Sequence, residues 1–203
     1  DVLLVADPAR MTSGQLDAWA RELDSYVLAD AFSALVARTD MARKKFERWR
    51  GRKAEFVAAV QTTFPGALLQ WEDFSNKTSF ENLFRYRETL PSFNDDIQGT
   101  GAVALSGIIG ALRITGGKLS EQRLLFLGAG EAGIGTADAF VAALVEEGMS
   151  VEEARKQCCF VDTQGLLTSK RENIAQHKQR FARNLPQIDD FLEVVNIWKP
   201  TAI

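Results

Sequence analysis

Apolar residues recur at helical spacing through the first part of the chain. Positions three or four apart carry the apolar side chains, which predicts an amphipathic helix with one face toward a core. This stripe comprises Leu16, Trp19, Leu23, Val27, Ala31 and Leu35. A basic stretch over 43–52 follows, in which Phe46 and Trp49 are spaced to share one helix face. Its cations are better explained as a solvated helix face than as a phosphate-binding patch.

The middle of the chain alternates short apolar runs with polar segments. Residues 67–71 form an apolar run of strand length, and the acids Glu72 and Asp73 follow it directly. The other elements expected here are helices over 53–60 and 79–88, a loop over 91–96, a helix of mostly small residues over 97–112 and a break at 115–117. Two acids at the end of a strand are well placed for chemistry.

The last third of the chain has the strongest pattern. An apolar run over 124–127 predicts a buried strand, and a glycine-rich segment and a helix that ends near Gly148 follow it. A capping box of Ser150 and Glu153 opens a short helix before a second strand that ends at Asp162. Residues 192–198 are expected as a helix and 200–203 as the start of a third strand. The pattern predicts an α/β chain with an incomplete Rossmann-type sheet.

Charge and composition narrow the possible partners and compartments. A net charge of -3, with acids and bases mixed along most of the chain, leaves no electrostatic footprint for nucleic acid. The apolar stretch 101–112 contains Gly and Ser and is shorter than the roughly 18 residues of a membrane span. We therefore expect no membrane partner. Cys158 and Cys159 are adjacent and form no disulfide framework, which favours a reducing compartment (cytoplasm, or mitochondrial or plastid matrix) over secretion.

A Gly-x-Gly-x-x-Gly run between a strand and a helix is the pattern of a dinucleotide-binding turn. Gly128 permits the tight turn, Gly130 lets the backbone approach a pyrophosphate, and Gly133 lets the helix pack on the strand. The helix N-terminus favours an anion through its free N–H groups and its dipole. Asp162 is the acid expected near the adenosine ribose, although it lies farther along than the usual spacing of about 20 residues. The alternative is a structural turn whose glycines serve packing alone.

A second candidate site is acidic. Glu72 and Asp73 follow one strand, and Asp95 and Asp96 stand in a Phe-Asn-Asp-Asp-Ile-Gln-Gly-Thr segment. Carboxylates that converge without basic partners repel one another, and a hard divalent cation such as Mg²⁺ or Mn²⁺ would offset that repulsion. From spacing alone, acids that cap helices and occupy loops are the simpler explanation.

Three segments together resemble the signature blocks of malic enzymes. They are 69–74, 93–100 and 126–133, and the segments 162–167 and 199–201 extend the resemblance. It covers about 52–203, whereas residues 1–51 do not resemble that family. The resemblance implies an NAD(P)-dependent, divalent-metal-dependent oxidoreductase that converts L-malate to pyruvate and CO₂.

The resemblance also implies residue roles. It assigns Glu72, Asp73 and Asp96 to the metal, and Asp95 to the support of a catalytic lysine. Lys178, three residues before Phe181, corresponds to a lysine that contacts the 2′-phosphate of NADP. NADP is therefore favoured over NAD, although Asp162 would oppose that phosphate if it pointed at it. The residues implied in cofactor binding are Gly128, Gly130, Glu131, Ala132, Gly133, Asp162 and Lys178.

The family's general-acid tyrosine and general-base lysine belong to blocks upstream of the matched region. Tyr26 and Tyr86 are the only tyrosines here, and neither stands in a Tyr-x-Pro context. We therefore expect that this chain alone does not turn over malate. The alternatives are a malolactic-type decarboxylase, which works without net redox change, and a non-catalytic nucleotide-binding fragment or pseudoenzyme. An unrelated reductase is disfavoured because it leaves the acidic residues unexplained.

These inferences divide the chain into three parts. Residues 1–51 are a helical segment of unidentified origin, 52–95 are part of a malate-binding and metal-binding domain, and 96–203 are a truncated NAD(P)-binding Rossmann domain. The chain is expected to be an excerpt of a longer protein, which the family implies to be a dimer or tetramer. His177 is expected at the surface without a catalytic role, and the two cysteines are expected to fill a buried strand.

Overall fold

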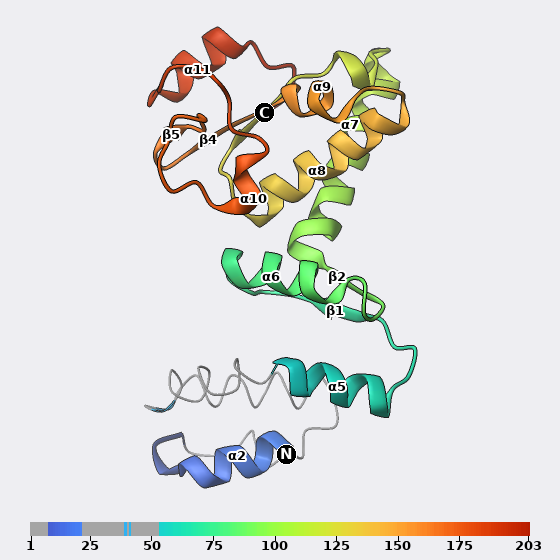
Figure 1. Cartoon of the computed structure of the whole chain (residues 1–203), viewed down its shortest axis with the longest axis vertical. Coiled ribbons are helices and arrows are strands. Elements are labelled where there is room, and N and C mark those ends of the chain that lie inside the picture. The colour runs from blue at the N-terminus through green and yellow to red at the C-terminus, as the bar shows by residue number, and fades with distance from the viewer. Residues whose placement is uncertain (1–7, 22–38, 40, 42–52) are drawn as a thin grey trace. The chain divides into compact units, whose positions relative to one another are not determined.

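The computed structural model describes residues 8–21, 39, 41 and 53–203 (Figure 1). Contacts divide the chain into two compact units, Asp1–Pro65 and Gly66–Ile203. The predicted apolar stripe beyond Arg21 and the basic stretch over 43–52 lie outside the described residues. The three-part domain division made from the sequence stays a prediction.

The described part of the first unit is helical. Its elements are η1 (Pro8–Arg10), α2 (Ser13–Arg21) and α5 (Lys53–Thr63). Thr12 and Gln15 bond reciprocally at the start of α2, because the Gln15 N–H donates to the Thr12 hydroxyl at 3.3 Å and the Thr12 N–H donates to Gln15 Oε1 at 2.9 Å. Leu16 is fully buried, as the predicted stripe requires. The helix expected over 53–60 is confirmed.

The second unit begins with two short parallel strands on either side of a helix. They are β1 (Leu69–Trp71), α6 (Asn76–Tyr86) and β2 (Ser92–Asn94). The loop expected over 91–96 is wrong, because Ser92–Asn94 pairs in register with β1, with Trp71 opposite Asn94. Three residues are too few for alternation to reveal a strand. The acids after β1 and those after β2 therefore leave the sheet at the same edge.

One long helix leads from this sheet toward the next one, and a second long helix packs against it. A π-helical turn, η2 (Asp95–Gly99), leads into α7 (Thr100–Thr115), and α8 (Glu131–Glu146) lies beside α7 (Figure 1). The two helices approach closely where Gly101 meets Gly135. A Cβ on Gly101 would lie 2.6 Å from the carbonyl oxygen of Gly135. Gly116 ends α7 in the left-handed conformation with φ +80°, which confirms the predicted break.

The turn and α7 form one continuous helix over Asp95–Thr115. Within the described residues, it is the one helix long and apolar enough to cross a membrane by length and composition. The helix is longer than the apolar stretch 101–112 noted in the sequence, because the turn over Asp95–Gly99, which contains two acids, adds to its start. Length and composition alone are weak evidence, and α7 packs against α8. The absence of a membrane partner stays a prediction.

The second sheet contains the nucleotide-binding pattern. Its strands are β3 (Leu124–Leu127), β4 (Cys158–Asp162) and β5 (Gly165–Leu166), in the order β3-β4-β5. β3 and β4 are parallel, as predicted, whereas β5 is antiparallel to β4 and was not anticipated. The third strand expected over 200–203 is reduced to one parallel bridge between Leu124 and Ala202. The remaining elements are η3 (Leu119–Glu121), α9 (Val151–Lys156), α10 (Gln176–Gln179) and α11 (Phe191–Trp198).

The sheet is covered on both faces. Leu124 and Phe160 pack in one apolar cluster with α8, whereas Leu125 and Val161 pack in another with α11. Successive strand residues point to opposite faces, so this division follows from the alternation. Cys158 and Cys159 are fully buried, which confirms the packing role, and burial raises the pKa of their thiols to about 12 and about 11. The architecture is the α/β Rossmann-type arrangement that the pattern predicted.

Candidate functional site

The glycine-rich turn connects β3 to α8. Gly128 has φ +119°, and its N–H donates to the carbonyl of Val161 at 2.7 Å. Gly130 is the N-cap of α8. A Cβ on Gly133 would lie 3.0 Å from the Gly128 oxygen and 3.6 Å from the Phe160 ring. The turn therefore has the tight bend and close helix packing of a dinucleotide-binding turn, and its contact with a dinucleotide stays a prediction.

Glu131 connects this turn to the acidic residues. It lies in the first turn of α8, while its neighbour Ala132 is exposed. Burial raises the pKa of Glu131, a side-chain hydrogen bond with Ser79 opposes that rise, and repulsion by Asp96 and Asp73 adds to it. The start of α8 and the acidic residues therefore lie close enough to interact, which spacing alone did not indicate.

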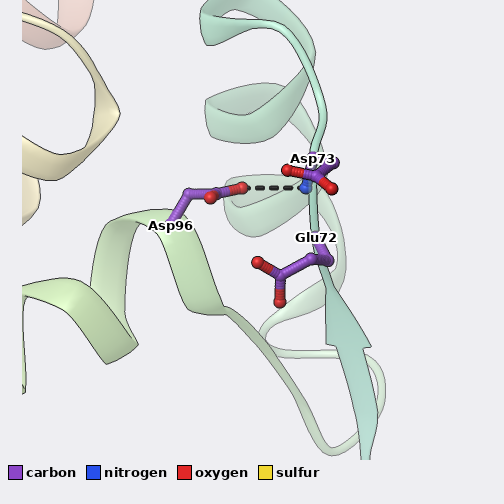
Figure 2. Close-up of side chains that lie close together, drawn as sticks. All are labelled: Glu72, Asp73 and Asp96. Atoms are coloured by element: carbon purple, nitrogen blue, oxygen red, sulfur yellow. Dashed lines mark hydrogen bonds between the residues drawn. The ribbon is translucent and has the colours of Figure 1, made fainter.

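Three carboxylates converge where β1 and β2 end (Figure 2). One ligand oxygen each of Glu72, Asp73 and Asp96 lies within 4.8 Å of the others. The Asp73 N–H donates to Asp96 Oδ2 at 2.9 Å, and Gln70 donates to Glu72 at 2.7 Å. No ion pair between described residues includes any of the three acids.

The donor set suits a hard divalent cation. All three side chains offer carboxylate oxygens, which Mg²⁺ and Mn²⁺ prefer. Asp73 has φ +54°, a left-handed conformation that is uncommon outside glycine. Such backbone strain persists where the surrounding structure enforces it. The three predicted ligands therefore fit the divalent cation that the sequence resemblance implies.

Asp95 is separate from these three acids. Its carboxylate folds back over Gly99, where a Cβ would lie 2.8 Å from Asp95 Cγ. Glycine at position 99 thus leaves room for this side chain. The role implied for Asp95, the support of a catalytic lysine, stays a prediction.

Asp162 ends β4 and is paired with two cations. Arg171 donates to its Oδ1 at 2.8 Å, and Lys178 lies 3.5 Å from its Oδ2. Burial disfavours the charged carboxylate, but hydrogen bonds from the Gln164 N–H and Arg171, with the charges of Arg171 and Lys178, outweigh burial and lower its pKa. A cavity of about 170 Å³ adjoins these residues. The sequence analysis did not identify Arg171. In the sequence it is only a basic residue in the segment after β4.

His177 does not lie free at the surface as the sequence suggested. It is half-buried, and its ring stacks on Phe80 with 4.2 Å between centroids and 10° between planes. The sequence could not show this contact because α6 and α10 are far apart along the chain.

Comparisons with known proteins agree with this architecture. The family model described as "Malic enzyme, NAD binding domain" matches residues 97–203, more than half of the chain. The NADP-dependent malic enzyme of Dictyostelium discoideum is 47% identical over 152 residues, or 73% of this chain and 28% of that protein. The NAD-dependent malic enzyme of Shewanella baltica is 42% identical over 157 residues, with the same shares of 73% and 28%.

A solved structure is similar as well. The crystal structure of Entamoeba histolytica malic enzyme matches with a TM-score of 0.53 and 29% identity, over 68% of this chain and 28% of that one. The chain therefore spans about 28% of the length of the curated relatives named here. The resemblance to malic enzymes is confirmed by all three comparisons. This chain belongs to the malic enzyme family and carries the NAD-binding domain of that family.

Proposed function

We propose that this chain supplies the dinucleotide-binding and metal-binding part of a malic enzyme that oxidatively decarboxylates L-malate to pyruvate and CO₂. One observation carries the proposal. The turn η2, which contributes Asp96 to the group of three acids, packs directly against α8, because a Cβ on Gly135 would overlap the backbone of Ile97. Asp96 and Asp73 also add to the rise in the pKa of Glu131 at the start of α8. A metal-bound hydroxy acid and a dinucleotide held at that helix start would therefore be neighbours, as hydride transfer between them requires.

The chain's own residues have distinct tasks in this proposal. Glu72, Asp73 and Asp96 would hold Mg²⁺ or Mn²⁺, which when bound supplies Lewis-acid polarisation of the substrate oxygen. The turn around Gly130 and the free N–H groups that begin α8 would hold the pyrophosphate of the cofactor. Asp162 would face the adenosine ribose.

We further propose that the cofactor is NADP rather than NAD. The sequence raised the objection that Asp162 would repel a 2′-phosphate. Arg171 and Lys178 both pair with Asp162, so the three side chains together carry a net positive charge. That pairing supports a site that accepts an additional phosphate.

Proton transfer is the step for which we expect this chain to need further residues. Tyr86 stacks on Trp71 with 5.3 Å between centroids, and its hydroxyl is buried without a hydrogen-bond partner. Tyr26 lies outside the described residues. L-malate as substrate, assembly as a dimer or tetramer, and activity that needs further residues are the remaining parts of the proposal.

The test is to titrate the 203-residue chain, confirmed folded by circular dichroism, with Mn²⁺ and separately with NADP. Calorimetry should detect binding of each ligand, and NADPH formation from L-malate should stay at the level of the buffer. A folded chain that binds neither ligand would contradict the proposed function. Turnover of malate would show that the chain contains its own acid and base.

A further inference from the structure

A short segment around α10 is held by contacts on several sides. α10 has four residues and no buried side chain of its own, so the helix has little intrinsic stability. The contacts of this segment reach three different elements. The pairs are His177 with Phe80 of α6, Lys178 with Asp162 of β4, Arg180 with Asp138 of α8, and Phe181 with Phe160 of β4.

We propose that His177 is a positioning residue, whose stacking on Phe80 holds the adjacent Lys178 against Asp162 at the adenosine end of the cofactor site. This inference rests on the proposed dinucleotide binding. It extends that proposal by naming a residue that acts on the cofactor through its neighbour.

The stacking geometry is that of a neutral ring pair. The His177 and Phe80 rings lie 4.2 Å apart and within 10° of parallel, and Phe80 is itself buried. His177 Nε2 is buried without a hydrogen-bond partner. Ring contact rather than a hydrogen bond at that nitrogen therefore holds the imidazole. A cavity of about 450 Å³ lies beside the pair and reaches Lys178, so displacement of the ring would have space to occur.

The backbone transmits this contact to Lys178. The Lys178 N–H donates to the carbonyl of Ala175 at 2.9 Å, and the Phe181 N–H donates to the carbonyl of Lys178 at 3.0 Å. His177 lies within this single turn. Loss of the ring contact would loosen the turn and let the Lys178 ammonium leave Asp162.

Burial of His177 and the charges around it make the contact depend on pH. Lys178 and Arg180 lie on the same segment, and Lys77 and Glu81 of α6 line the adjacent cavity. Burial lowers the pKa of His177 below 6.5, and the charges of Lys178 and Arg180 lower it further. The released segment therefore binds a proton more readily than the stacked one, and stacking weakens as pH falls below 6.5.

Two variants separate the effect of ring packing at position 177 from the effect of protonation. His177→Ala removes the ring, whereas His177→Phe keeps a flat aromatic ring that does not titrate. The first measurement is hydrogen exchange of the Lys178 and Phe181 amides in the ligand-free chain. We expect exchange in His177→Ala to be about two- to tenfold faster than in the wild type, the range given by one aromatic pair, and unchanged in His177→Phe. Equal exchange in all three proteins would overturn the inference.

The second measurement is the affinity for NADP and for NAD, by fluorescence titration. At pH 7.5, His177→Ala should bind NADP about two- to tenfold more weakly and NAD with a smaller loss, while His177→Phe should match the wild type. At pH 5.5, His177→Phe should bind NADP more tightly than the wild type. The 2′-phosphate itself titrates at about pH 6, so variants are compared at the same pH.

The outcomes distinguish the two proposals. Unchanged affinity in His177→Ala, despite faster exchange, would mean that the contact is structural only and would overturn the positioning role. A folded wild-type chain that binds neither dinucleotide would overturn the proposed function, and the inference with it. If the wild-type chain binds NADP and only the expected differences between the variants are missing, the positioning role of His177 is wrong and the proposed function stands.

Discussion

Both sheets of the second unit have acidic residues at the ends of their strands, but the charges around these acids differ. Beyond β1 and β2, Glu72, Asp73 and Asp96 gather within 4.8 Å, without an ion-pair partner in the described part of the chain. Beyond β4, Asp162 is held by Arg171 and Lys178. One edge therefore has uncompensated negative charge, and the other has excess positive charge.

This difference indicates which ligand each edge can take. Converging carboxylates gain from a divalent cation, which offsets their mutual repulsion. A carboxylate already neutralised by two cations leaves positive charge for an anionic group, such as a phosphate. The family supplies the names of the ligands, but the charge balance at each edge follows from the residues themselves.

The largest effect is expected when a carboxylate is removed from the acidic edge. Asp96→Asn should weaken Mn²⁺ binding by about a hundredfold, because changes even in supporting residues of metal sites cost about 10–100-fold. Isothermal titration calorimetry of the folded variant measures this loss. Glu88→Gln, at an exposed acid paired with Arg87, is the matched control and should bind Mn²⁺ normally. Equal Mn²⁺ affinity of the two variants would show that Asp96 is not a metal ligand.

The next test concerns the helix crossing that places η2 beside α8. Gly101→Ala should lower the free energy of unfolding by about 1–3 kcal/mol, because the added methyl meets the backbone of Gly135 at 2.6 Å. Gly107→Ala lies in the same helix, with no atom within 4 Å of the added methyl. It should raise stability by up to about 1 kcal/mol, since alanine favours helix. Urea unfolding of both variants is decisive, and equal changes would contradict the close crossing.

A third change tests the charge balance at the edge beyond β4. Arg171→Met should cost about 1–2 kcal/mol at pH 7, because Asp162 loses its 2.8 Å hydrogen bond in a largely buried position. The pKa of Asp162 is lowered below 3.8 in the folded chain, so this contribution is present above pH 3.8 and disappears as pH falls through the lowered value. Unfolding at pH 7 and pH 3 should show the difference shrink. A difference that did not depend on pH would rule out Asp162 as the cause.

The smallest effect is expected from a substitution that tests the choice between NADP and NAD. Lys178→Gln should weaken NADP binding by a few-fold, about 1 kcal/mol for a partly exposed ion pair, and NAD binding by less. Fluorescence titration of both dinucleotides provides the measurement. Lys170→Gln, an exposed lysine in the same segment, serves as the control. Equal losses for NAD and NADP would refute the proposed contact with the 2′-phosphate.

Elements with a local signal were predictable from sequence. β3 and β4 are apolar runs of four or more residues, α9 has its own capping box, and Gly116 ends α7, so neighbouring residues sufficed to find them. β2 has three residues and is created by pairing with β1, which lies far along the chain, so its own residues do not reveal it. β5 has two residues and pairs with β4 across a tight turn, and two residues are too few for an apolar pattern to show a strand.

The candidate site also has parts that the sequence predicted and parts that it could not predict. The convergence of Glu72, Asp73 and Asp96 followed from charge and family resemblance, and the geometry agrees with it. Spacing alone did not separate Asp95 from Asp96, whereas the family resemblance gave them different roles, and the turn directs Asp95 over Gly99. The partners of Asp162 and of His177 depend on how loops fold back, which spacing does not encode.

The hydrogen bond between the Asp73 N–H and Asp96 has a further consequence. It fixes the loop after β1 against the turn after β2, at 2.9 Å, while Asp73 stays in its left-handed conformation. A cation that enters this edge would meet ligands already drawn together by the fold. Less conformational entropy would then be lost on binding, and the cost of assembling the site would be carried in advance by folding.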